Sequence, residues 1–206
     1  MKRSINLILT LSLVFLVLAC SGSEDESAKE VSDKQESPTT SFRKSNWGMT
    51  PEEVKATESA IPISDNENLV LYQETFLNMP AKMGYVFKDG KLIKGAYLFE
   101  ERFENPDDYI LSYEKVKNSV IIDLGPPSLD EIKWVDEDSS QLEASGSEVC
   151  EGKVVYRSEW VERDTLVTLL LEGANNKCRQ GIVFQSKSNY LIENPENENF
   201  NESNPN

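Results

Sequence analysis

The sequence predicts an α+β fold in which two helices pack on antiparallel meander sheets, and its order of elements allows two similar α-β-β-β halves. The first observation behind this prediction is a pair of helix starts, each with a proline directly after a capping residue. The second is that each helix is followed by short runs rich in β-branched and aromatic residues, which are typical of strands. Short turns between such runs make neighbouring strands antiparallel, so a meander is expected in both halves.

The first helix is predicted to begin at Thr50 and to end near Ser59. Thr50 is a good N-cap, Pro51 occupies the first helical position, and Glu53 completes a Thr-x-x-Glu capping box. Trp47 lies just before this helix. A large aromatic side chain in that place is predicted to fill the core rather than to form a ligand platform.

Three strands are predicted next, over residues 68–77, 82–88 and 91–100. Asp89-Gly90 separates the second strand from the third, and this dipeptide is a strong signal for a two-residue hairpin turn. The three strands are therefore expected to form an antiparallel meander.

The second helix has the same type of start, with Asn105 as the cap and Pro106 at the first helical position. Its apolar face is made of residues spaced three or four positions apart: Tyr109, Tyr113, Val116, Val120 and Leu124. Gly125, which two prolines follow, ends the helix. A further strand is predicted over residues 129–135, and an acidic, serine-rich loop over residues 136–147.

The last third of the chain predicts a hairpin around a two-residue turn at Arg163-Asp164. In this register, cross-strand pairs form one apolar face: Trp160 with Val167, Ser158 with Leu169, and Tyr156 with Leu171. The opposite face carries polar residues: Arg157, Glu159, Thr168 and Glu172. A final strand is predicted over residues 181–187, and the Asn- and Glu-rich residues 189–206 are predicted to be disordered.

The N-terminus has the three parts of a signal segment. Lys2 and Arg3 form a positive region, an apolar region of 14 residues follows at positions 5–18, and a small residue precedes Cys20. Spanning a bilayer takes about 20 apolar residues, so this segment is too short for a stable membrane span. The Val-Leu-Ala-Cys sequence that ends at Cys20 resembles the lipobox of bacterial lipoproteins. That resemblance implies cleavage before Cys20 and acylation of this cysteine; an ordinary cleaved signal peptide and an uncleaved anchor are the alternatives.

This interpretation divides the chain into four parts. Residues 1–19 are a signal peptide, residues 20–45 a lipidated cysteine with an acidic tether, residues 46–192 the α+β domain, and residues 193–206 a disordered tail. The predicted location is the cell envelope, with a lipid anchor. The residue after Cys20 is Ser21 rather than an aspartate. This resembles the pattern that directs lipoproteins to the outer membrane in diderm bacteria.

Cys150 and Cys178 form an even pair in an exported compartment, and this favours a disulfide over free thiols. In the hairpin register described above, Cys150 lies opposite Lys177, one residue from Cys178. A bridge between the two cysteines then needs a bulge or a strand end at that point.

Composition limits the function further. The formal charge is −15, and removing Lys2 and Arg3 lowers the count of basic residues from 21 to 19 against 36 acidic ones, which gives −17 for the mature chain. A field of that sign repels nucleic acid and anionic headgroups, so no nucleic-acid partner is expected. The chain has no histidine, which removes the commonest general base and zinc ligand. We therefore expect no catalytic, cofactor-binding or metal-binding residues.

These observations favour a non-enzymatic envelope lipoprotein with a structural or binding role. Its expected partners are membrane lipid, through acylated Cys20, and another envelope protein. A surface-exposed ligand-binding module is the first alternative. A carboxylate-based enzyme or a Ca²⁺-binding domain that uses Asp136, Glu137 and Asp138 is the second. A solvated loop explains these acids better, because the glycine and distal glutamate of an EF-hand loop are absent.

Two short motifs carry a resemblance to a known family. Trp47-Gly48-Met49-Thr50 at the first helix start and Gly125-Pro126-Pro127 after the second helix are distantly similar to the pattern of the SmpA/OmlA family of outer-membrane assembly lipoproteins. In that family a Gly-Met-Thr helix start is followed by a Gly-x-Pro turn and by strands with aromatic residues. The resemblance implies an exported bacterial lipoprotein that serves the outer membrane, and it transfers no functional residue to this chain.

Overall fold

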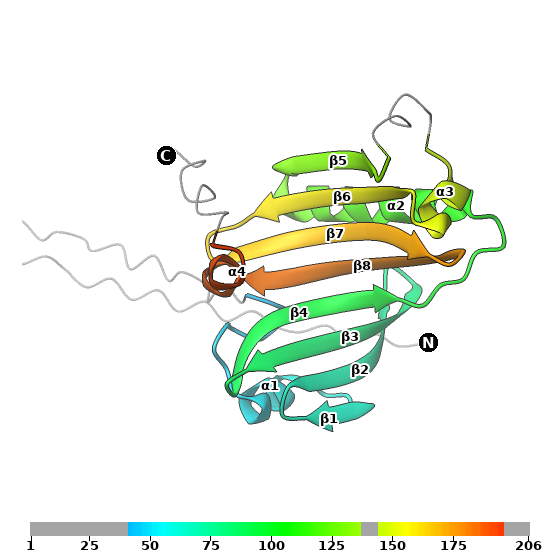
Figure 1. Ribbon diagram of the computed structural model, residues 1–206. Coiled ribbons are helices and arrows are strands. Elements are labelled where there is room, and N and C mark those ends of the chain that lie inside the picture. The colour runs from blue at the N-terminus through cyan, green and yellow to red at the C-terminus, as the bar shows by residue number, and fades with distance from the viewer. Residues whose placement is uncertain (1–40, 137–143, 196–206) are drawn as a thin grey trace, which may run out of the picture. The chain divides into compact units, whose positions relative to one another are not determined.

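The computed structural model describes residues 41–136 and 144–195. The helices are α1 (Pro51–Thr57), α2 (Asp107–Leu124), α3 (Gly146–Glu151) and α4 (Lys187–Glu193). The strands are β1 (Ser64–Asn66), β2 (Leu69–Phe76), β3 (Met79–Lys88), β4 (Lys91–Phe99), β5 (Leu129–Trp134), β6 (Val154–Val161), β7 (Thr165–Ala174) and β8 (Lys177–Ser186). These strands form one 8-stranded antiparallel sheet with helices packed on it (Figure 1). The predicted α+β fold class is confirmed.

The sheet is built from two meanders that meet at its centre. The first half of the domain runs from α1 through β1, β2, β3 and β4, and the second half runs from α2 to β8. The strand order is β1-β2-β3-β4-β8-β7-β6-β5, so β4 and β8 pair at the centre, with Tyr97 opposite Ile182. The first strands of the two meanders, β1 and β5, lie at the outer edges (Figure 1). The first half has one strand more than predicted, namely β1, and the second half has the four strands predicted in its sequence.

Two-residue turns connect several of the strands. The predicted turn at Asp89-Gly90 is confirmed, because the φ angles of these residues are 52° and 70°. Leu77-Asn78 and Asn175-Asn176 form further turns of this kind, with φ angles between 51° and 65°. Positive φ at both turn residues gives a twist that matches antiparallel strands. The strand predicted over residues 68–77 consequently ends at Phe76.

Both predicted helices form. The Thr50 side chain accepts a hydrogen bond from the backbone N–H of Glu53, whose carboxylate accepts one from the backbone N–H of Thr50 at 2.8 Å. This capping box starts α1 as predicted. α2 begins one residue later than predicted, because Pro106 precedes its first turn and Asn105 Oδ1 accepts a bond from the N–H of Asp107. The buried residues of α2 are Tyr109, Ser112, Tyr113, Val116 and Val120.

The predicted hairpin register is also confirmed. β6 and β7 pair Tyr156 with Leu171, Ser158 with Leu169 and Trp160 with Val167. This face of the sheet contacts α2, since the Tyr113 hydroxyl lies 2.6 Å from Ser158 Oγ and the Trp160 indole N–H donates to Gly125 O at 2.9 Å. α1, α2 and α3 thus cover the face that carries the core, and we call it the helix-covered face.

The other face of the sheet carries the polar residues that the register predicted. Near one end of this face, Tyr190 and Leu191 of α4 lie beside Val161 and Leu166. Glu159 is buried there and pairs with Arg157 and Thr168. Part of this face is therefore shielded by α4, and its central part has no helix over it among the residues that the structure describes.

Two predicted boundaries in the second half are wrong. The end of the loop predicted over residues 136–147 is the start of α3, where Ser145 and Glu148 form a second capping box. Cys150 therefore lies in a helix rather than in a strand. Residues 187–193 form α4, which replaces the end of the predicted last strand and the start of the predicted disorder.

The domain also begins earlier than predicted. The predicted tether over residues 20–45 includes Phe42 and Ser45, yet both are buried, and Phe42 belongs to the core. The predicted signal peptide, Cys20, and the predicted tail beyond residue 195 lie outside the described residues.

Candidate functional site

The segment from Ser41 to Ser45 crosses the sheet where the two halves meet. We call the line along which β4 and β8 pair the seam. Phe42 packs there against Tyr85 and Tyr97 of the first half, and against Phe184 of the second, with ring centroids 5.3, 5.7 and 5.1 Å apart. Gly95 of β4 makes this approach possible, because a Cβ at that position would lie 2.0 Å from the Phe42 ring. The two halves are thus joined by an aromatic side chain as well as by backbone hydrogen bonds.

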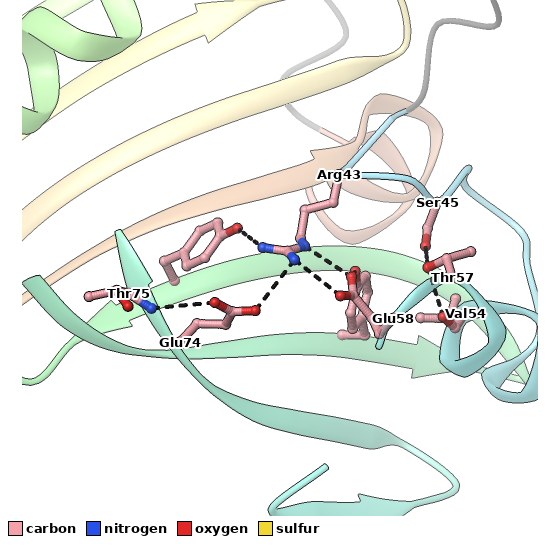
Figure 2. Close-up of polar contacts among 9 residues, drawn as sticks. Arg43, Ser45, Val54, Thr57, Glu58, Glu74 and Thr75 are labelled. Carbon is pink, nitrogen blue, oxygen red and sulfur yellow. Dashed lines mark hydrogen bonds and ion pairs between the residues drawn. The ribbon is translucent and has the colours of Figure 1, made fainter. Parts of the chain in front are cut away.

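Arg43 fastens this segment to the first half (Figure 2). Its Nε and Nη2 donate to the two carboxylate oxygens of Glu58 at 2.9 and 3.0 Å. Its Nη1 donates to the Tyr97 hydroxyl at 2.7 Å, and Nη2 also lies 3.4 Å from Glu74 Oε1. The Tyr85 hydroxyl donates to Glu58. The Arg43 cluster, as we call these five residues, links strands β2, β3 and β4 to the residues on either side of α1.

The members of the Arg43 cluster differ in their exposure to water, since 29% of the Arg43 side chain and 26% of the Glu74 side chain are exposed. Only 4% of the Glu58 side chain is exposed, so its carboxylate depends on the bidentate bond from Arg43. Burial disfavours the charged guanidinium, but hydrogen bonds to Tyr97 and Glu58 outweigh this and raise the pKa of Arg43. Burial also raises the pKa of Tyr85 and of Tyr97 above the ordinary value of a phenol. The arrangement is that of a clamp at the edge of the core, in which a partly exposed guanidinium holds a nearly buried carboxylate.

A cavity of about 510 Å³ lies beside this cluster on the helix-covered face. Its walls are largely apolar and come from both halves: Phe42, Phe76, Tyr97, Leu124, Val167 and Phe184. The β6–β7 turn adds Arg163 and Asp164 at its rim. We call it the seam cavity. Its volume is within the range of small-molecule sites, and apolar walls favour an apolar ligand.

The predicted disulfide is present. Cys150 of α3 and Cys178 of β8 are bonded, with their Cα atoms 4.3 Å apart, and both residues are buried. The sequence register required a bulge or a strand end near Cys150. In the structure Cys150 lies in α3, a helix that contacts β7 and β8 and brings this residue to Cys178. Gly173 permits this contact, since a Cβ at that position would lie 2.1 Å from Val149 O.

The acidic residues considered for Ca²⁺ are only partly described. Asp136 is the last described residue after β5, while Glu137 and Asp138 lie outside the described residues. Across residues 41–136 and 144–195, no three His, Cys, Asp or Glu side chains are grouped as metal ligands would be. Trp47 lies against the core, as predicted, and its indole N–H donates to Thr165 Oγ1 at 3.0 Å.

Sequence reasoning missed the seam and the Arg43 cluster. Phe42 is an aromatic residue at the end of a long polar run, and this was the one local sign that the run ends before residue 46. Glu58 and Arg43 are separated by 15 positions, and no periodicity relates them. Their pairing follows from the path of the chain over the sheet, which the sequence pattern does not specify.

No helix among the described residues has the length and apolar character needed to cross a membrane. The resemblance to the SmpA/OmlA family stays a prediction. Comparison of the chain with protein-family models, with curated proteins and with solved structures gives no match.

Proposed function

We propose that this chain is a lipid-anchored protein of the bacterial cell envelope, with a non-enzymatic structural or binding role. The observation that carries this proposal is the disulfide between Cys150 and Cys178. Disulfides form and persist in oxidising compartments outside the cytosol, so the bond supports export of the domain. Export is also what the signal-like N-terminus predicts.

The anchor is proposed to be the acylated Cys20. Each buried CH₂ group of an acyl chain contributes about 0.8 kcal/mol to membrane binding, so two or more chains hold a protein stably. Twenty residues separate Cys20 from Ser41, where the described domain begins. A chain of this length spans at most about 70 Å, which limits how far from the membrane the domain works.

A Cys20→Ala variant tests the anchor. Cells that express the full chain are given a clickable fatty acid, and label and protein are then followed in membrane and soluble fractions. We expect the wild type to carry label in the membrane fraction, and Cys20→Ala to lose both label and membrane retention. A Cys150→Ala/Cys178→Ala variant is the matched control and should keep its label. A Cys20→Ala protein that is still labelled would overturn the proposal.

A ligand-binding role is the second candidate, and the seam cavity is the observation that favours it. Its apolar walls and its volume of about 510 Å³ suit a compact apolar or aromatic group. The lining also includes charged side chains of both signs that can meet the polar end of such a ligand: Arg43, Glu162, Arg163 and Asp164.

The fluorescent probe 8-anilinonaphthalene-1-sulfonate, an aromatic group with one sulfonate, tests this role. We expect saturable fluorescence enhancement with the folded wild type. Leu124→Trp should fill the cavity and abolish the signal, whereas Ile122→Trp, on an exposed part of the same helix, should leave it unchanged. Equal signals from the two variants would contradict binding at the seam.

A further inference from the structure

The outer edge of β5 differs from the outer edge at the other end of the sheet. β1 has three residues, all polar, whereas β5 has six and is flanked by Val135. No strand of the described residues pairs with the outer edge of β5. Ile132 and Val135 are 53% and 70% exposed there. An unpaired edge strand presents free N–H and C=O groups that another strand can use.

The register of β5 on β6 shows which backbone groups are free. The N–H of Val135 donates to Lys153 O at 2.9 Å, and the same register pairs Lys133 with Val155 and Glu131 with Arg157. In an antiparallel ladder, alternate residues turn their backbone groups to the same neighbour. The odd-numbered residues of β5 therefore bond to β6. Asp130, Ile132 and Trp134 direct their N–H and C=O groups to the open edge.

The alternation in β6 supports this assignment. The N–H of Glu162 donates to Thr165 O at 2.9 Å, so the even-numbered residues of β6 bond to β7. The odd-numbered residues of β6 are left for β5, in agreement with the pairing of Glu131 with Arg157.

A second copy of β5 can pair antiparallel with the first in only a few registers. Residues with outward backbone groups must lie opposite one another, so the register changes in steps of two residues. When Ile132 lies opposite Ile132 of the second copy, Glu131 lies opposite Lys133 of that copy, and Leu129 lies opposite Val135. The two-fold axis gives the Glu131–Lys133 and Leu129–Val135 contacts twice and the Ile132–Ile132 contact once.

The neighbouring registers are disfavoured by charge. Sliding the second copy by two residues in one direction places Glu131 opposite Glu131. Sliding it in the other direction places Lys133 opposite Lys133. Like charges directly opposite one another destabilise a strand pair, and opposite charges stabilise it. The sequence of β5 therefore selects the register centred on Ile132.

The other charges at this edge permit the pairing. Glu131 lies 3.8 Å from Arg157 Nη1, a long contact that leaves its carboxylate able to meet a lysine. Asp130, which would face Trp134 of the second copy, is already held by Lys117 at 3.1 Å and by Ser158 at 2.6 Å. No buried charge is left without a partner by the pairing.

We propose that β5 is a self-association edge, at which two copies of this chain pair antiparallel about a two-fold axis with Ile132 at its centre. The two sheets then form one continuous sheet. A pair of six-residue strands buries less than the roughly 800 Å² per partner of a standard interface, so we expect a weak, concentration-dependent dimer.

A cysteine at the centre of the pair captures the dimer. Residues opposite one another in a hydrogen-bonded pair have Cα atoms about 5.5 Å apart, within reach of a disulfide. Full-length Ile132→Cys protein in membranes is oxidised with copper phenanthroline and run on a non-reducing gel. We expect a band of doubled mass. Ile122→Cys is the control, since Ile122 is 84% exposed but belongs to α2 and not to the edge strand, and it should give at least fivefold less dimer.

Charge reversal then tests the register. Adding Glu131→Lys or Lys133→Glu to the Ile132→Cys protein should reduce cross-linking severalfold, and the two reversals together should restore it. The thermal midpoint of each variant shows whether it is folded. Cross-linking of Ile132→Cys no stronger than that of Ile122→Cys would overturn the association. Folded variants without recovery in the double reversal would overturn the register. Wild-type protein oxidised in parallel measures any cross-link that Cys20 itself forms, and this background is subtracted from every variant.

Discussion

Each half of the domain has a leading helix and four antiparallel strands, with α3 and α4 added in the second half, but the two halves are stabilised differently. In the second half, the 18-residue α2 lays an apolar face on the sheet, and the Cys150–Cys178 disulfide ties α3 to β8. In the first half, α1 has seven residues and buries a single side chain, Val54. The segment that contains Phe42 and Arg43 completes the cover of that half. The second half is therefore stabilised by apolar packing and a covalent bond, and the first half by a polar clamp together with aromatic side chains.

The buried polar groups show the same contrast. The second half contains a short relay in which the Ser158 hydroxyl donates to Asp130 and meets the Tyr113 hydroxyl. The first half contains the Arg43 cluster, in which the guanidinium forms a bidentate ion pair with the nearly buried Glu58 side chain. Removing one member of a charged pair leaves an uncompensated charge, so the first half is expected to be more sensitive to single polar substitutions.

The largest expected effect is loss of the disulfide. Cys150→Ala/Cys178→Ala should lower the free energy of unfolding by about 3.5 kcal/mol, because the bond closes a loop with a sequence separation of 28 residues. Urea unfolding followed by far-UV circular dichroism measures this change. Reduced wild type should behave like the variant, and equal midpoints for oxidised and reduced wild type would show that the bond does not stabilise the second half.

Removing the guanidinium of the Arg43 cluster should have the next largest effect. Arg43→Met leaves the Glu58 carboxylate buried with only the Tyr85 hydroxyl as a donor, and we expect a loss of about 2 kcal/mol. This value allows for the partial exposure of Arg43. Chemical denaturation is the measurement.

A second variant separates charge from packing in the Arg43 cluster. Arg43→Met/Glu58→Gln removes both charges and should recover part of the loss seen in Arg43→Met. If the double variant is less stable than Arg43→Met, the pair is not the clamp of the first half.

Combining Arg43→Met with the disulfide variant should give additive losses of stability, because the two sites lie in different halves and share no partner.

A smaller effect is expected from the relay in the second half. Tyr113→Phe removes one buried hydrogen bond to Ser158 and should cost about 1 kcal/mol. Thermal unfolding detects a change of this size. Tyr109→Phe is the comparison, because the Tyr109 hydroxyl accepts a longer hydrogen bond, with 3.4 Å between its oxygen and the backbone nitrogen of Phe103. Equal midpoints for Tyr113→Phe and wild type would show that the hydroxyl adds nothing to the second half.

The smallest effect is one of pH at the start of α3. Hydrogen bonds from the backbone and side chain of Ser145 lower the pKa of Glu148 below its ordinary value of 4.5. A lowered carboxyl pKa adds stability above the ordinary value, and this is lost as pH falls through the folded-state pKa. Glu148→Ala should therefore be less stable than wild type at pH 7, and the difference should vanish below that folded-state pKa. A difference that stays constant with pH would exclude the carboxylate as its cause.

Local chemistry explains which parts of the fold could be predicted. The capping box of Thr50, the turn at Asp89-Gly90 and the alternation around Arg163-Asp164 are each set by residues close together in sequence. The capping residues Ser145 and Glu148 of α3 were also visible, but the acidic run before them favoured a loop. α4 could not be predicted from its own residues, because Tyr190 and Leu191 lie against strands β6 and β7, which come much earlier in the chain.

The candidate site could not be predicted because it is assembled from both halves. Phe42, Tyr97 and Phe184 meet only after the two meanders have paired at β4 and β8. The disulfide is an intermediate case. The even number of cysteines in an exported chain favoured the pairing of Cys150 with Cys178, whereas the helix that brings them together was not expected.

The central claim is that this domain works outside the cytosol on a lipid anchor, and the N-terminus of the mature protein tests it most directly. The full chain is purified from membranes in detergent, digested, and its N-terminal peptide measured by mass spectrometry. The proposal predicts a peptide that begins at Cys20 and is heavier than its sequence by two or three acyl chains. A peptide that begins at Met1, or one that contains an unmodified Cys20 thiol, would contradict it.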